Sequence, residues 1–161
     1  PILPDAWPPT SPGWRGRIGD MATTRSASTH WEGSLFEGAG KTTFDSSGVG
    51  TFDVSWPSRA EEANGKTSPE ELIAAAHSAC FSMAFSNGLA KAGTPPTALD
   101  TSAEVDFVPG TGITQIRLTV RGTVEGMSED DFVAAAQAAK EGCPVSQALS
   151  AVEILLDAAL A

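Results

Sequence analysis

Hydrophobic and polar residues alternate along residues 113–125. The apolar positions are Ile116, Leu118, Val120 and Val124, and the polar positions among them are Arg117, Thr119, Arg121 and Thr123. A period of two places the apolar side chains on one face of an extended strand and the polar ones on the other. The pattern therefore predicts a strand in a sheet that has one buried and one solvated face.

Further strands are expected ahead of this segment. Residues 101–108 form a second β-prone run, joined to it by the turn residues PGTG, and residues 25–56 contain short β-prone runs broken by glycines. These runs predict antiparallel strands, with those of residues 25–56 arranged as a meander. Residues 57–67 are polar and are expected to form a loop.

Three helices are marked by residues that favour their first turn. Ser68 and Ser128 are each followed three positions later by an acidic residue, as in a capping box, and Gly142 offers a stop for the second helix. Cys143 at a cap, with Pro144 just inside, predicts a short third helix.

The order of these elements predicts the fold class. Residues 151–160 are ambiguous, because their alanines favour a helix whereas their larger apolar residues alternate as in a strand. The order strands, helix, strands, helices predicts an α+β fold, with a mostly antiparallel sheet and helices on one side. Residues 1–20, rich in proline, are expected to be an extended arm upstream of a natural start at Met21, and residues 21–161 a single domain.

Composition and charge narrow the partners and the location. Apolar content of 41 % and charged content of 19 % are typical of a folded globular protein and not of a disordered chain. A net charge of −10 with scattered basic residues disfavours nucleic acid and anionic membranes as partners. We identify neither a stretch of the roughly 20 apolar residues that a membrane helix needs nor a signal sequence, so a cytoplasmic location with reduced thiols is expected.

Cys80 lies in the middle of the helix predicted after Ser68. One face of this helix carries Ile73, Ala76, His77, Cys80, Met83 and Ala84, flanked by Phe81 and Phe85. We therefore expect Cys80 to be well buried, either as an ordinary core residue or as a reactive thiol in a dry pocket. A reactive thiol requires a cation near its sulfur, and Arg59 is the nearest arginine in sequence outside the strands.

Cys143 is expected at a helix N-terminus, where free backbone N–H groups and the helix dipole favour a thiolate. An accidental cap in a tight turn is the alternative. A buried attacking thiol with a second, anion-stabilised thiol is the arrangement of a two-cysteine peroxidase. A metal site made of His77, Cys80 and Cys143 is less favoured because its ligand set is incomplete. A Cys–His pair for acyl transfer is disfavoured because spacing of i, i+3 points both side chains outward in parallel.

Glu70 precedes Cys80 by ten residues. At a rise of 1.5 Å per helical residue this separation is about 15 Å, so the carboxylate cannot reach the thiol of its own helix. It would act at such a thiol only if the helix pairs with a second copy of itself, as in a two-fold dimer. The alternative is that Glu70 only supplies negative charge to the first turn of the helix.

Two segments carry a resemblance to a known family. They are SPEELIAAAHSACFSMAFS, residues 68–86, and KEGCPVSQAL, residues 140–149. They resemble the OsmC/Ohr family of organic hydroperoxide reductases, and its OsmC branch in particular, with a likeness that runs from about Thr29 to the C-terminus. The resemblance implies an intertwined α+β homodimer, with an antiparallel sheet wrapped around central helices, active sites at the interface, and a strand for the ambiguous C-terminal segment.

The resemblance also implies roles for single residues. Cys80 is similar to the peroxidatic cysteine of the family and Cys143 to the resolving one. Glu70 is similar to the acid that positions a catalytic arginine, and both are contributed by the partner chain. Arg59, in the loop ahead of the P-E-E-L motif, is the arginine expected in this role.

The implied reaction reduces an organic hydroperoxide to its alcohol through a Cys80 sulfenic acid, which Cys143 resolves as a disulfide, in defence against oxidative and osmotic stress. No cofactor is expected, and an external dithiol donor reduces the disulfide. The residues expected to bind substrate are Ile73, His77, Phe81, Met83 and Phe85. Two other interpretations stay open: a redox-sensing stress protein without fast turnover, and a metal-binding module.

Overall fold

The computed structural model describes residues 22–161, so the arm expected over residues 1–20 lies outside the described residues. The described chain begins with three strands, β1 (Ser28–Glu32), β2 (Ala39–Thr43) and β3 (Thr51–Ser55). They form one antiparallel sheet in the order β1-β2-β3. The predicted meander is confirmed.

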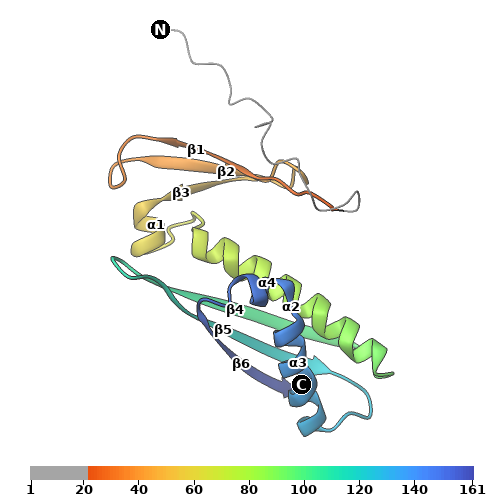
Figure 1. The fold of residues 1–161 in the computed structure, drawn as a ribbon. Helices are drawn as coiled ribbons and strands as arrows, with labels where there is room; N and C mark the ends of the chain where they lie inside the picture. Colours follow the sequence, from red (N-terminus) through yellow and green to blue (C-terminus); the bar gives the residue numbers. More distant parts are fainter. Residues whose placement is uncertain (1–21) are drawn as a thin grey trace.

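A short helix, α1 (Trp56–Ala60), follows β3. It occupies the first residues of the segment predicted as a polar loop, so that prediction is wrong there. Two serines form a capping box, in which the Ser55 hydroxyl accepts from the Ser58 backbone N–H and the Ser58 hydroxyl accepts from the Ser55 backbone N–H. The box holds α1, which carries Arg59, where the chain turns from the first sheet toward the long helix (Figure 1).

The long helix α2 (Pro69–Lys91) begins at the predicted cap, where the Ser68 hydroxyl accepts from the Glu71 backbone N–H at 3.2 Å. By length and composition alone α2 could cross a membrane, and it is the one helix within residues 22–161 of which this holds. The sequence predicts no stretch with the length and composition of a membrane helix, and α2 corrects this expectation. The central helix of a compact domain meets the same test, and here α2 packs against α3 and β4, which are described next.

The second sheet contains β4 (Ala98–Val108), β5 (Gly112–Thr123) and β6 (Glu153–Leu160), with β5 in the centre. Strands β4 and β5 are antiparallel, and β6 runs parallel to β5. Helices α3 (Glu129–Gly142) and α4 (Pro144–Ala148) lie between β5 and β6 and make the crossover that a parallel pair requires. The C-terminal segment is a strand, and the predicted α+β class is confirmed, with one parallel pair in the sheet.

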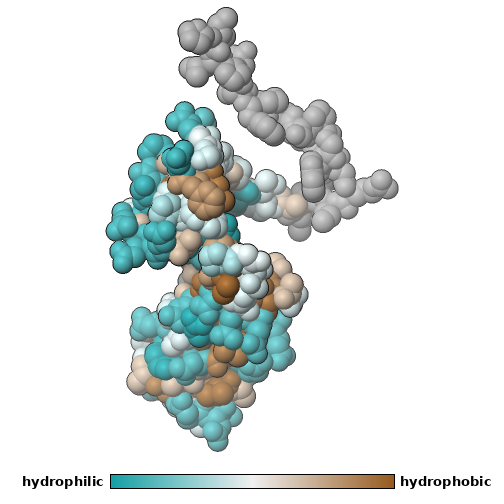
Figure 2. Space-filling model, turned by 90° about the vertical axis from the view of Figure 1, so that its left-hand side faces the viewer, coloured by the Kyte–Doolittle hydropathy of each residue, from teal (hydrophilic) through white to brown (hydrophobic). Residues whose placement is uncertain are grey.

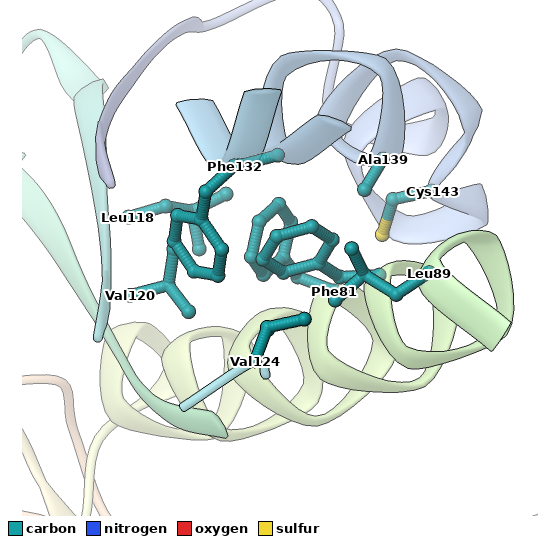
Figure 3. Close-up of a cluster of buried hydrophobic side chains, with 10 residues drawn as sticks. Phe81, Leu89, Leu118, Val120, Val124, Phe132, Ala139 and Cys143 are labelled. Carbon is teal, nitrogen blue, oxygen red and sulfur yellow. The ribbon is translucent and has the colours of Figure 1, made fainter. Parts of the chain in front are cut away.

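Helices α2 and α3 cover one face of the second sheet, and their apolar side chains form the core (Figure 3). The buried cluster comprises Phe81, Phe85, Leu89, Leu118, Val120, Val124, Phe132, Ala136, Ala139 and Cys143. The rings of Phe85 and Phe132 meet edge to face with centroids 5.0 Å apart. The packing is close enough to require a glycine at position 122, because a Cβ there would lie 2.5 Å from the Phe132 ring.

The first sheet stands apart from this core. Figure 2 shows it as a separate mass, joined by a narrow waist to the rest of the molecule. Large apolar side chains of the sheet and its loops stay exposed, among them Trp31, Leu35, Phe36, Val49 and Phe52. On α2, Met83 is 72 % exposed. In the single chain these side chains leave apolar surface exposed to solvent.

Candidate active site

The two cysteines come from separate elements and lie close to each other. Cys80 lies in the middle of α2, whereas Cys143 is the single residue between α3 and α4. Figure 3 shows the sulfur of Cys143 pointing toward α2, and Cys80 packs against the buried cluster that contains Cys143, close enough for each thiol to affect the pKa of the other. Both are free thiols. The fold therefore brings together two sulfurs that lie 63 residues apart in the chain.

The burial of Cys80 differs from what the sequence suggests. Cys143 is fully buried, whereas Cys80 is only partly buried. The expectation that Cys80 is well buried is therefore corrected. The reason is that α2 has apolar residues around most of its circumference, so the sequence does not reveal which side packs on the sheet. The side that does so carries Phe81, Phe85 and Leu89.

The surroundings of the two sulfurs disfavour a thiolate at Cys80 and favour one at Cys143. Burial raises the pKa of the Cys80 thiol, and contact with Cys143 adds to this effect. Burial acts in the same direction on Cys143, but the backbone N–H and hydroxyl of Ser146 and the thiol of Cys80 outweigh it, so the pKa of Cys143 is lowered. In the single chain Cys143 is therefore the better anion, and Cys80 requires an added cation to become one.

Arg59 and Glu70 form a bidentate ion pair. Arg59 Nε lies 3.1 Å from Glu70 Oε1 and 3.3 Å from Oε2, and Arg59 Nη2 lies 2.9 Å from Oε1. The Glu70 side chain is 8 % exposed and that of Arg59 31 %. The α1 helix and the start of α2 thus hold a guanidinium in one orientation, with one side open to solvent.

Aromatic rings support the same arginine. The guanidinium carbon of Arg59 lies 4.1 Å from the centre of the Phe107 ring, at cation–π distance. Phe107 packs edge to face on Trp56, with centroids 6.0 Å apart. An apolar cavity of about 380 Å³ opens beside Arg59, between the first sheet and the start of α2, and its lining includes Trp31, Leu35, Val54, Trp56 and Leu72.

The arginine pair and the thiol pair are separate within one chain. Glu70 and Cys80 are ten residues apart on one helix, or about 15 Å along its axis. The other arginines of residues 22–161 are also engaged elsewhere, Arg117 with Glu104 and Asp106, Arg121 with Asp157, and Arg25 with the Thr24 carbonyl. None of these charges contributes to the pKa of Cys80.

His77 has a different environment from the one expected of a substrate-binding residue. Its ring is fully buried, and its Nε2 lies 2.7 Å from the hydroxyl oxygen of Ser146 in α4. The ring is fully buried in the single chain, and contact between His77 and substrate stays a prediction. Ser146 was not singled out from the sequence, and its only signal there is its place three residues after Cys143, in the first turn of α4.

The other residues expected to bind substrate are divided between the core and the surface. Phe81 and Phe85 are fully buried and in ring contact, with centroids 5.7 Å apart. Both rings belong to the core of the single chain, and a direct contact between them and substrate stays a prediction. Ile73 is half-buried and Met83 is exposed, so these two side chains remain accessible in the single chain.

The ligands of the alternative metal site do not come together as a group. Within residues 22–161 no three His, Cys, Asp or Glu side chains are placed to share a metal ion. His77 faces Ser146, whereas Cys80 and Cys143 face each other. The geometry supports thiol chemistry at the two sulfurs.

The fold thus brings two free thiols, placed by separate elements, close to each other. Residues 62–157 match the family described as OsmC-like protein. The chain belongs to this family.

Known relatives extend the match over most of the chain. Peroxiredoxin OsmC of Escherichia coli (strain K12) is 42 % identical over 140 residues, which cover 85 % of this chain and 96 % of that protein. The solved structure of an organic hydroperoxide resistance protein OsmC from Legionella pneumophila has a TM-score of 0.65 and 24 % identity, and covers 85 % of this chain and 97 % of its own. An organic hydroperoxide resistance protein from Elizabethkingia anophelis has a TM-score of 0.68 and 22 % identity, covering 89 % of this chain and 100 % of its own. The two structures confirm the fold.

Proposed function

We propose that the protein is a thiol-dependent peroxidase that reduces organic hydroperoxides to alcohols. The observation that carries the proposal is the closeness of Cys80 to Cys143, since Cys80 packs against the buried cluster that contains Cys143 and each thiol affects the pKa of the other. The relative named peroxiredoxin, 42 % identical over 140 residues, supports an oxidoreductase that acts on peroxides.

The proposed cycle has three steps. The Cys80 thiolate attacks one peroxide oxygen, the O–O bond breaks, and the alkoxide leaves and takes a proton to become the alcohol. The Cys143 thiolate then attacks the Cys80 sulfenic acid, the S–S bond forms, and hydroxide leaves and takes a proton to become water. An external dithiol finally reduces the disulfide by exchange, which fits a cytoplasmic location where thiols are kept reduced. No cofactor enters the cycle.

The cation for Cys80 comes, on this proposal, from a second copy of the chain. If two antiparallel α2 helices pair about a two-fold axis that passes midway between Glu70 and Cys80, the start of one helix lies near the middle of the other, which brings the partner's Arg59 and Glu70 to Cys80. Two features of the single chain support such a dimer. The guanidinium of Arg59 has an open side, and α2 leaves Met83 and several alanines exposed.

An organic peroxide fits the surroundings of Arg59 better than hydrogen peroxide does. The cavity of about 380 Å³ beside this arginine is lined mainly by apolar side chains. Binding there would remove an alkyl or aryl group from water, which favours binding by roughly 0.8 kcal/mol of free energy for each buried CH₂ group. Hydrogen peroxide has no such group and gains nothing from the cavity. The exposed Met83 of α2 and the half-buried Ile73 would extend the apolar contact.

A slow redox sensor is the second candidate, and one observation favours it. Burial raises the pKa of Cys80 in the single chain, and a protonated thiol reacts slowly with peroxides. The two functions differ in rate. A sensor oxidises slowly at micromolar peroxide and does not depend on donor concentration, whereas a peroxidase turns over at a rate that rises with the donor.

Two serine variants test the proposed cycle with cumene hydroperoxide and a dithiol. Cys80→Ser is expected to abolish turnover, because the attacking sulfur is gone. Cys143→Ser is expected to complete one oxidation and then stop, because no disulfide can form. Steady-state turnover by Cys80→Ser at the wild-type rate would overturn the proposal, and slow, donor-independent oxidation of the wild type would favour the sensor.

A further inference from the structure

A buried hydrogen bond joins the two helices that carry the thiols. His77 lies one turn before Cys80 on α2, and its Nε2 is 2.7 Å from the hydroxyl oxygen of Ser146 on α4. The His77 ring is fully buried and Ser146 is 6 % exposed. The proposed cycle uses neither residue.

The other ring nitrogen of His77 reveals which atom donates. Nδ1 is buried and has no hydrogen-bond partner within residues 22–161. A buried N–H without a partner is rarer in proteins than an acceptor without one. Nδ1 is therefore the bare nitrogen, and the single proton of the neutral ring lies on Nε2. His77 then donates to Ser146, which leaves the Ser146 hydroxyl hydrogen available for another acceptor.

The sulfur of Cys143 is the acceptor in reach. Ser146 follows Cys143 by three residues, in the first turn of the helix that Cys143 begins. The Cys143 side chain makes no capping hydrogen bond in the structure. When this thiol ionises, its sulfur becomes a hydrogen-bond acceptor for the donors in the first turn of α4. The backbone N–H and the hydroxyl of Ser146 both act to lower the pKa of the Cys143 thiol.

We propose that His77 and Ser146 form a donor chain to the ionised Cys143, in which the Nε2–H of His77 donates to the Ser146 hydroxyl and this hydroxyl donates to the sulfur once it is a thiolate. Both are positioning residues, and they hold Cys143 as a thiolate ready to attack the Cys80 sulfenic acid. The inference deepens the proposed function and rests on it for the role of Cys143. No proton leaves the chain during the attack, since the displaced hydroxide takes its proton from solvent.

Charged groups on the neighbouring elements do not account for the same effect. On α3, Lys140 Nζ donates to the Ile154 carbonyl and Glu141 accepts from Gln137. Helix α4 carries no titratable side chain. On α2, the titratable neighbours of the sulfur are Cys80 and His77 themselves. Apart from the Cys80 thiol, which the test removes in every protein compared, the donor chain is the side-chain contribution that a single substitution can remove.

The test is a spectroscopic titration of the Cys143 thiol in the Cys80→Ser protein. The sequence has two cysteines and no tyrosine, so thiolate absorbance near 240 nm then reports Cys143 alone. Adding Ser146→Ala is expected to raise the midpoint of the titration by about one pH unit, the size of one hydrogen bond to a charged group. Adding His77→Leu is expected to raise it by a smaller amount, because the hydroxyl loses its orienting donor.

A conservative variant separates positioning from packing. His77→Gln retains an N–H donor near Nε2 and is expected to keep the midpoint within a few tenths of a unit of the parent, whereas His77→Leu shifts it. Unchanged midpoints in both Ser146→Ala and His77→Leu would overturn the proposal, and so would equal shifts in His77→Gln and His77→Leu. If one variant does not fold, as judged by circular dichroism, the other two still decide.

The titration needs no peroxide, so its outcome is distinct from that of the proposed function. A second measurement tests the donor chain and the proposed peroxidase cycle together, in proteins that retain both cysteines. After one equivalent of cumene hydroperoxide, Ser146→Ala is expected to form the disulfide several-fold more slowly and to accumulate a sulfenic acid that dimedone traps. A wild-type protein that is not oxidised at all would sink the peroxidase proposal and leave the titration result intact.

Discussion

Glu70 holds Arg59 in place, and its removal tests whether the orientation of this arginine matters for Cys80. In Glu70→Gln the side chain keeps its shape and one oxygen but loses its charge. Hydrogen bonds to a charged partner contribute about 1.5–3 kcal/mol, and the three contacts here lie at 2.9–3.3 Å. Since Arg59 is 31 % exposed, water compensates in part, and we expect a loss of about 1–2 kcal/mol in stability.

The expected effect on rate is larger than the effect on stability. Stacking on Phe107 keeps the guanidinium nearby but no longer in one orientation. A displacement of about 1 Å at a reacting centre costs up to roughly 100-fold in rate. We therefore expect the second-order rate constant for oxidation of Cys80 by cumene hydroperoxide to fall by about 10- to 100-fold, measured in a single turnover by stopped flow.

Glu71→Gln is the matched control, because it makes the same chemical change at the next position. Glu71 is exposed and accepts from the Thr67 hydroxyl, away from Arg59. It is expected to react at the wild-type rate. A folded Glu70→Gln protein that also reacts at the wild-type rate would refute the reasoning that Glu70 orients the arginine.

Two further predictions concern stability. Gly122→Ala is expected to lower the free energy of unfolding by about 3 kcal/mol, because its Cβ would lie 2.5 Å from the Phe132 ring. The control Gly142→Ala, whose Cβ would have nothing within 4 Å, is expected to be neutral or slightly stabilising. Similar urea midpoints for the two variants would contradict this prediction. Burial lowers the pKa of His77, so the folded chain resists its protonation. The stability that depends on the neutral ring is complete above the unfolded pKa of about 6.5 and is lost as the pH falls toward the lowered folded pKa. Between pH 7.5 and 5, His77→Gln should therefore lose less stability than the wild type, and an identical pH profile for the two proteins would show that His77 does not contribute.

The local signals in the sequence predicted most of the secondary structure. The caps at Ser68 and Ser128 and the Cys143–Pro144 start each begin a helix, and the alternation in β5 matches its buried positions. These features depend on neighbours within one turn or one strand, so a single sequence contains them. The β6 strand was ambiguous by pattern because alanine is compatible with both states, and family resemblance resolved it.

What the sequence did not reveal depends on contacts between distant residues. The hydrogen bond between His77 and Ser146 spans 69 residues, and no local pattern marks Ser146 as a partner. The burial of Phe81 and Phe85 in place of Cys80 depends on which side of α2 meets the sheet. Helix α1 was missed because it is five residues long and contains a proline, although the paired serines Ser55 and Ser58 were a usable signal.

The central claim is that the partner's Arg59 activates Cys80, and chains with different defects test it directly. One chain carries Arg59→Met with Glu70→Gln, so that no buried charge is left unpaired, and the other carries Cys80→Ser. Each is expected to be inactive alone. Refolded together in equal amounts, half of the dimers are mixed, and each mixed dimer has one complete site of two.

Peroxidase activity of this mixture, with mixed dimers verified through two different affinity tags, is the decisive measurement. We expect about a quarter of the wild-type activity, all of it in the doubly tagged fraction. Mixed dimers as inactive as the two parent variants would contradict the account, because a site built within a single chain cannot be restored by a partner that carries the other defect.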